Sequence, residues 1–152
     1  AGTEAGVGSE PQATFSTGFG APFLPRPAMV YANMLAQKIS KHGSTCYFVN
    51  TGWSAGPYGV GHRMDLAATR AMVTSALSGK LADAPTTQDP IFGLHIPNHV
   101  PGVADELLIP KKSWNNPANY DAKAKELAAL FTKNFEKFSE VPAEVKSAGP
   151  RG

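Results

Sequence analysis

The sequence has little that would indicate a secreted, membrane or nucleic-acid-binding protein. Cys46 is the only cysteine among 152 residues, so an internal disulfide and a cysteine-based zinc site are excluded. No apolar run approaches the roughly 20 residues that a membrane-spanning helix needs. The N-terminal residues lack the charged and apolar regions of a signal peptide. A net charge of only +2 is too small to predict nucleic acid or an anionic membrane as the main partner.

What remains is typical of a globular protein. Hydrophobic residues make up 42% and charged residues 17% of the chain, which is enough for one domain with a core. The 15 glycines and 13 prolines predict many turns. The chain does not begin with Met, so we expect it to be processed or part of a longer protein. The C-terminal residues do not match a peroxisomal SKL-type signal, so a cytoplasmic location is expected.

The spacing of apolar and turn-forming residues predicts helices and strands in alternation. Apolar residues three and four apart indicate helices, whereas short runs of β-branched and aromatic residues bounded by Gly or Pro indicate strands. Helices are predicted over 28–42, 66–78 and 119–138, and strands over 14–23, 45–49 and 91–96. A helix, a short turn and a buried strand in this order are typical of α/β proteins.

Single residues sharpen these predictions. Gly43 and Gly79 are expected to end helices, and Asp65 is expected to cap the start of one. Cys46 is expected to be a small core residue, because it lies inside the apolar run 45–49. The last helix is predicted to bury one apolar face opposite its lysines, formed by Tyr120, Leu127, Leu130, Phe131, Phe135 and Phe138.

A glycine-rich segment between the predicted strand 45–49 and the following helix is the strongest candidate site. It contains Gly52, Gly56, Gly59 and Gly61, and glycine allows close approach of a ligand to the backbone. Arg63 at its end could stack on a base or contact a phosphate. The segment matches neither the P-loop pattern nor GxGxxG. The pattern alone therefore leaves both an anion- or nucleotide-binding loop and a structural loop open.

The histidines give no metal motif. His95 and His99 are four apart, but Pro97 between them disfavours the helix that would bring them together. No Glu or third His stands at a supporting spacing. We therefore expect these histidines to serve as surface or hydrogen-bonding residues.

Several segments, taken in order, resemble the last third of ATP-dependent phosphoenolpyruvate carboxykinases. They are GTEAGV at 2–7, FSTGFGAPFL at 15–24, VNTGW at 49–53, GPYGVGHRM at 56–64, TRAM at 69–72, FGLHIP at 92–97, VPGV at 100–103 and KELAALF at 125–131, with NF at 134–135. The resemblance extends over essentially the whole chain. An ordered set of segments is far more specific than the glycine-rich loop alone. Gly18 departs from the family, which commonly has Cys there.

This resemblance implies an enzyme of gluconeogenesis that reversibly converts oxaloacetate and ATP to phosphoenolpyruvate, carbon dioxide and ADP, with Mg²⁺ and Mn²⁺. By position, Arg63, Met64 and Thr69 match residues that contact the nucleotide, with Arg63 on the adenine and ribose side. The family's P-loop, metal ligands and substrate-binding residues would lie upstream of residue 1. No catalytic or metal-binding residue is therefore expected in this segment, and the isolated chain is expected to be inactive.

The expected fold is α/β: the C-terminal part of a mixed-sheet, mononucleotide-binding domain, finished by a long helix. Residues 1–13 are expected to be a loop, 14–138 the core and 139–152 a tail. The expected partners are ATP or ADP, the remainder of the same enzyme and, through that remainder, oxaloacetate or phosphoenolpyruvate, but neither nucleic acid nor a membrane. The alternatives are a stand-alone nucleotide- or anion-binding module without catalysis, and a structural segment with no ligand.

Overall fold

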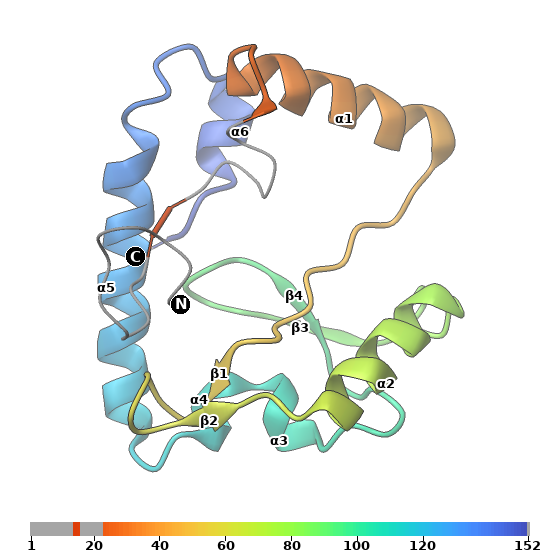
Figure 1. The fold of residues 1–152 in the computed structure, drawn as a ribbon, viewed down its shortest axis with the longest axis vertical. Coiled ribbons are helices and arrows are strands. Elements are labelled where there is room, and N and C mark those ends of the chain that lie inside the picture. The colour runs from red at the N-terminus through yellow and green to blue at the C-terminus, as the bar shows by residue number, and fades with distance from the viewer. Residues whose placement is uncertain (1–13, 16–22, 152) are drawn as a thin grey trace. The chain divides into compact units, whose positions relative to one another are not determined.

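The computed structural model describes residues 14–15 and 23–151, and the chain divides into two units, residues 1–44 and 45–152 (Figure 1). In the first unit, helix α1 (Ala28–His42) follows Pro27 and ends at Gly43, whose φ of 60° is left-handed. The Gly43 N–H donates to the Ile39 carbonyl, as expected at a helix C-terminus. The predicted helix over 28–42 and its glycine stop are confirmed.

The second unit is mostly helical, with two small antiparallel sheets. Its elements are β1 (Trp53–Ser54), β2 (His62–Arg63), α2 (Leu66–Leu77), β3 (Thr86–Gln88), β4 (His95–Pro97), α3 (Asp105–Leu108), α4 (Pro110–Ser113), α5 (Pro117–Phe135) and α6 (Ala143–Ser147). Strand β1 pairs with β2, and β3 pairs with β4. The mixed sheet expected from the sequence is not formed within the part of the chain that the structure describes.

Helices α2 and α5 begin at side-chain caps. The Asp65 carboxylate accepts from the Ala67 N–H at 3.4 Å, which confirms the predicted cap of α2. The Asn116 side chain accepts from the Ala118 N–H at 2.9 Å, and Pro117 occupies the first turn of α5. Helix α5 therefore starts before the predicted residue 119. It ends at Phe135 and is followed by a turn in which the Phe138 N–H bonds the Phe135 carbonyl.

The core of the second unit forms where α2 meets the proline-rich segment after β4. Ala68, Val100 and Val103 are buried there. The partly buried residues packed against them are Met64, Ala71, Met72, Leu81, Leu107 and Leu108. The segment 97–117 thus contains α3 and α4 and contributes core side chains. On α5 only Ala124 and Ala128 are buried, so its predicted apolar face is covered only in part.

The predicted strand over 45–49 is wrong for the described structure. These residues pair with no described strand, Phe48 is 90% exposed and Cys46 is exposed as well. A β-forming run becomes a strand only when a neighbouring strand accepts its backbone hydrogen bonds, and local sequence cannot supply one. Cys46 is therefore not the core residue that was expected.

The predicted strand over 91–96 is shifted toward its C-terminal end. Only His95–Pro97 forms β4, whereas residues 89–94 form the connection from β3. In that connection the Gly93 N–H donates to the Asp89 carbonyl at 2.9 Å. The expected loop 1–13 and most of the expected strand 14–23 lie outside the described residues. Apart from Phe15, the resembling segments before Phe23 lie outside them as well.

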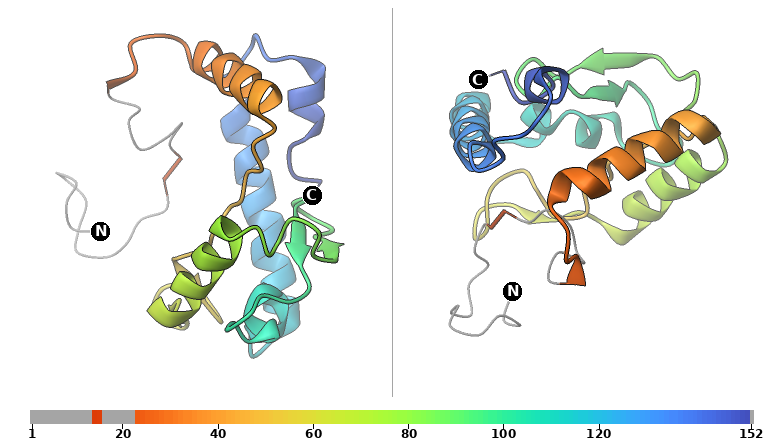
Figure 2. Two further views of the ribbon diagram at one scale, coloured as in Figure 1. Left: turned by 90° about the vertical axis from the view of Figure 1, so that its right-hand side faces the viewer. Right: turned by 90° about the horizontal axis from the view of Figure 1, so that it is seen from above.

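The expected tail contains a short helix. Helix α6 lies alongside the C-terminal part of α5 (Figure 2). The Arg151 N–H donates to the Ile91 carbonyl at 2.6 Å and so ties the end of the tail to the β3–β4 connection. Among the described helices, none combines the length and the apolar character needed to cross a membrane.

Candidate functional site

The glycine-rich segment folds as a hairpin in which Trp53 lies opposite Arg63 and Ser54 opposite His62. The ladder continues one step further, because the Met64 N–H donates to the Gly52 carbonyl at 2.8 Å. The start of the hairpin is fixed by the Asn50 side chain, whose oxygen accepts from the Gly52 N–H at 2.9 Å. The glycine-rich segment predicted as a loop is therefore a hairpin that leads directly into α2.

The hairpin is closed by its own backbone. A Cβ added at Gly61 would overlap the carbonyl oxygens of Ser54 and Gly56, so only glycine fits there. The N–H groups of Val60 and Gly61 both donate to the Pro57 carbonyl, at 3.1 and 2.9 Å. These N–H groups are already satisfied, so they do not form a cradle for a phosphate.

The three candidate residues lie within a short stretch at the junction of β2 and α2. The Arg63 side chain is exposed, whereas Met64 and Thr69 are half-buried. Successive residues of a strand point to opposite faces, so Arg63 and Met64 leave the hairpin on opposite sides. Met64 packs against the core cluster, and Thr69 lies in the first turns of α2, where its N–H bonds the Asp65 carbonyl at 2.9 Å.

The start of α2 is unsuited to a phosphate. Free N–H groups at a helix N-terminus attract anions, but here the Asp65 carboxylate already occupies this position. Its negative charge repels a phosphate and favours a neutral group. The hairpin and the start of α2 can thus accept a base or a ribose beside the Arg63 guanidinium, with the Thr69 hydroxyl available as a donor or acceptor.

An apolar cavity of about 400 Å³ opens beside Met64. Its wall includes core residues, the unpaired segment 46–50, and His95 of β4. This cavity could not be predicted from sequence, because residues far apart in the chain form it. The cavity could hold an apolar group, including side chains from another polypeptide segment.

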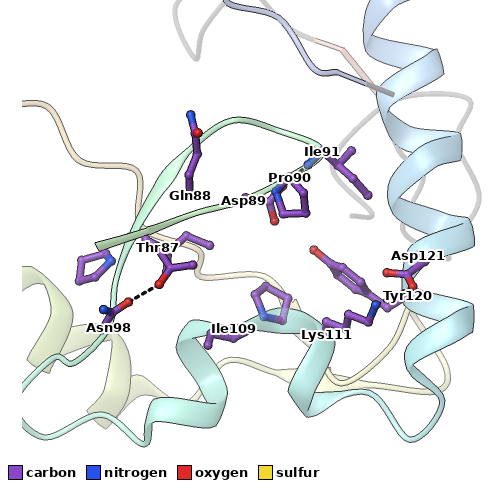
Figure 3. A pocket seen from close by; sticks show the side chains of 13 residues that line it. Thr87, Gln88, Asp89, Pro90, Ile91, Asn98, Ile109, Lys111, Tyr120 and Asp121 are labelled. Atoms are coloured by element: carbon purple, nitrogen blue, oxygen red, sulfur yellow. Dashed lines mark hydrogen bonds and ion pairs between the residues drawn. The ribbon is translucent and has the colours of Figure 1, made fainter. Parts of the chain in front are cut away.

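A smaller cavity, of about 150 Å³, lies between the β3–β4 hairpin and the start of α5 (Figure 3). Tyr120 projects into it, next to the ion pair in which Lys111 contacts Asp121 at 2.6 Å. Burial raises the pKa of the Tyr120 hydroxyl above its usual value, and the negative charges of Asp89 and Asp121 raise it further. Sequence periodicity placed Tyr120 on an apolar face and gave no sign of this polar surrounding.

The histidines form separate local contacts. The His95 ring lies 3.3 Å from the Thr86 hydroxyl, and the His99 ring lies 2.9 Å from the Asp105 carboxylate. Within residues 14–15 and 23–151, no group of three or more His, Cys, Asp or Glu side chains could hold a metal ion. The described residues therefore do not fit a magnesium or manganese site. On α5, Lys123 pairs locally with Glu126 at 2.6 Å.

Relatives among known proteins match this chain over nearly its whole length. The family described as "Phosphoenolpyruvate carboxykinase" matches residues 1–106. A relative called "Phosphoenolpyruvate carboxykinase (ATP)" in Geobacillus thermodenitrificans is 58% identical over 149 residues, covering 98% of this chain and 28% of the relative. Proteins of the same name in Caldanaerobacter subterraneus and Bacillus subtilis are both 55% identical, over 152 and 150 residues, covering 100% and 99% of this chain. The chain spans 28% to 29% of the length of these relatives.

Proposed function

Because the chain belongs to the ATP-dependent phosphoenolpyruvate carboxykinase family, we propose that it supplies the adenine side of the nucleotide site in such an enzyme. The complete enzyme would convert oxaloacetate and ATP to phosphoenolpyruvate, carbon dioxide and ADP in gluconeogenesis, in the cytoplasm. In this proposal Arg63, Met64 and Thr69 contact the nucleotide. The phosphate-binding loop, the Mg²⁺ and Mn²⁺ ligands and the oxaloacetate site belong to other parts of the enzyme.

One observation carries the proposal: the exposed Arg63 is presented by a hairpin that leads directly into α2. A planar guanidinium can stack on a base or donate to a ribose. The Asp65 cap disfavours a phosphate at the same place. The site is therefore suited to the base and ribose end of ATP rather than to its phosphates.

The test uses a chimera in which this chain replaces the matching residues of the Bacillus subtilis relative. Arg63→Ala should raise the KM for ATP about ten- to a hundredfold, because hydrogen bonds to a charged group contribute about 1.5–3 kcal/mol. The kcat should change little, because Arg63 lies away from the phosphates that react. Lys80→Ala is the matched control, since Lys80 is an exposed cation beyond the far end of α2. An unchanged KM in Arg63→Ala would refute the proposal.

Met64 and Thr69 can be tested separately in the same chimera. Thr69→Val removes the hydroxyl but keeps the side-chain shape, so we expect a smaller rise in the KM for ATP than with Arg63→Ala. Met64→Leu preserves the apolar contact and should leave the KM nearly unchanged, whereas Met64→Ala should raise it and also destabilise the core that Met64 packs against. Equal effects of Met64→Leu and Met64→Ala would argue against an apolar contact with the base.

We further propose that the segment 45–49 and the cavity beside Met64 pack against the remainder of the enzyme. Phe48 is 90% exposed within a β-forming run that has no partner among the described strands. Phe48→Ser should therefore improve the solubility of the isolated chain but destabilise the chimera, because the same side chain would be buried there. A change of the same sign in both proteins would contradict this packing.

The isolated chain should show no oxaloacetate-dependent consumption of ATP, because phosphoryl transfer requires a phosphate cradle and metal ions. If the isolated chain instead bound ADP as tightly as the chimera does, the alternative of a stand-alone nucleotide- or anion-binding module would be favoured. Calorimetric titration of both proteins with ADP distinguishes the two cases.

A further inference from the structure

We propose that Trp53 and Tyr58 are positioning residues for Arg63, which they hold in register on the β1–β2 hairpin. This inference rests on the proposed function for the identity of the ligand, but its structural part stands on the geometry of the hairpin alone. The edge of one ring contacts the face of the other, with centroids 5.2 Å apart and planes at 82°. This contact joins β1 to the connecting loop, and no resemblance or sequence pattern pointed to it.

The pairing pattern places Trp53 and Arg63 on the same face of the hairpin. The Met64 N–H bonds the Gly52 carbonyl, so Gly52 and Met64 form a hydrogen-bonded pair. Pairs alternate along an antiparallel ladder, which makes Trp53 and Arg63 a non-hydrogen-bonded pair. Directly opposite residues in such a pair share a face, and their side chains are at their closest. We therefore expect a change at Trp53 to affect the placement of Arg63.

The register of this hairpin needs support from side chains. Strands β1 and β2 contain only two residues each, and an isolated short hairpin is marginally stable in water. A slip of one residue would turn Arg63 to the opposite face, toward the core side where Met64 lies. Gly61 fixes the C-terminal end of the loop between β1 and β2, because its backbone packs against the backbone of Ser54 and Gly56. The Trp53–Tyr58 contact fixes the loop to β1 as well.

Tyr58 is the better position at which to test the ring contact, because its side chain lies in the loop, is 50% exposed and can be removed with little effect on the core. Trp53 is half-buried and also lines a cavity beside Leu127 and Trp114, so its removal would affect packing elsewhere. Tyr58→Ala removes the ring contact, whereas Tyr58→Phe keeps it. Trp53→Phe keeps an aromatic ring at the first position and serves as the conservative variant there.

The chain contains a matched control in its other tryptophan–tyrosine pair. Trp114 and Tyr120 also meet edge to face, at 5.7 Å and 76°, at the start of α5. Tyr120→Ala removes a comparable contact from a more buried position, so it should destabilise the fold at least as much as Tyr58→Ala. Tyr120 lines the same cavity as Trp53 but lies outside the β1–β2 hairpin, so Tyr120→Ala should affect Arg63 less than Tyr58→Ala does.

Two readouts decide the proposal. In the full 152-residue chain, the NOE between the Hα protons of Trp53 and Arg63 reports the register of β1 against β2. In the chimera, the KM for ATP reports the placement of Arg63. Tyr58→Ala should weaken the NOE and raise the KM about two- to tenfold, as the usual strength of an aromatic pair implies. Tyr58→Phe and Trp53→Phe should preserve both readouts, and kcat should stay constant.

Contrary results separate the two proposals. If Arg63→Ala raises the KM but Tyr58→Ala changes neither the NOE nor the KM, the positioning role is wrong and the proposed function stands. If Tyr58→Ala weakens the NOE but neither Tyr58→Ala nor Arg63→Ala changes the KM for ATP, the proposed contact of Arg63 with the nucleotide is wrong. If Tyr120→Ala raises the KM as much as Tyr58→Ala does, the effect is one of general stability and the positioning role is overturned.

Discussion

Hairpins β1–β2 and β3–β4 both join short antiparallel strands, but different groups hold them together. In β3–β4, side chains bridge the strands and their flanks: the Thr87 hydroxyl donates to the Asn98 side chain at 2.6 Å, and the Gln88 amide donates to the Gly93 carbonyl at 3.0 Å. In β1–β2, the Gly61 backbone packs against the backbone of Ser54 and Gly56 instead.

This difference has a functional consequence. A hairpin that is closed by its backbone leaves its cross-strand side chains available for a ligand, as Arg63 is. A hairpin that is closed by side chains uses those groups internally, and its Thr87 and Gln88 already have partners. Substitutions should therefore affect the two hairpins differently: a methyl group at the loop glycine should disrupt β1–β2 more, and loss of a hydrogen-bonding side chain should disrupt β3–β4 more.

The largest expected effect comes from a methyl group added at the loop glycine of each hairpin. Gly61→Ala should reduce the free energy of unfolding by about 3 kcal/mol or more, because the Cβ would overlap backbone atoms that cannot move aside. Gly93→Ala should cost only about 1–2 kcal/mol, since its φ of 69° is strained but the nearest atom is 4.0 Å from the new Cβ. Chemical denaturation of both variants measures the difference, and equal losses would contradict the comparison.

The next effect concerns the turn of β3–β4. The Asp89 carboxylate accepts from the N–H groups of Ile91 and Phe92, at 2.9 and 2.7 Å. Asp89→Ala should destabilise the chain by about 1–3 kcal/mol, because these part-buried donors lose their partner. Asp83→Ala, at an exposed position, is the control. In the chimera Asp89→Ala should leave the KM for ATP unchanged, which would set β3–β4 apart from β1–β2.

A smaller effect is expected for the threonines of β3. Thr87→Val should cost about 1 kcal/mol, the usual net value of one hydrogen bond. Thr86→Val should cost less, because the Thr86 hydroxyl lies 3.3 Å from the His95 ring, against 2.6 Å for Thr87 and Asn98. Both positions are exposed strand positions, so the pair forms its own control. Equal unfolding midpoints for the two variants would argue against the role of the shorter bond.

The smallest effect is a pH dependence at Tyr120. Its pKa is raised in the folded state, so the folded chain holds this proton more tightly than the unfolded chain does. The contribution is constant below the ordinary tyrosine pKa of about 10 and is lost as the pH rises through the folded value. Stability should therefore fall more steeply above about pH 10 in the native chain than in Tyr120→Phe. Parallel pH profiles would contradict the raised pKa.

Much of the helical structure could be predicted from local signals. The limits of α1 and the cap of α2 follow from spacing, Gly43 and Asp65, all of which act within a few residues of the chain. The early start of α5 also had a local signal in Asn116 and Pro117, which sequence reasoning did not use. Helices depend on near neighbours along the chain, so these signals suffice.

The strands and cavities could not be predicted in the same way. The run 45–49 has strand-forming residues but no described partner, and β4 occupies only the last part of the predicted strand. Pairing depends on residues that are distant in sequence. For the same reason the surroundings of Tyr120, which join β3–β4 to α4 and α5, had no signal in its own segment. The hairpin around Arg63 was found as a glycine-rich segment, but its pairing was not.

The central claim is that β1–β2, and not β3–β4, presents a residue to the nucleotide. The most direct test compares the KM for ATP of the chimera carrying Arg63→Ala with that of the chimera carrying Thr87→Val. The account predicts a rise of about ten- to a hundredfold for Arg63→Ala and none for Thr87→Val. Equal KM values in the two chimeras would contradict it.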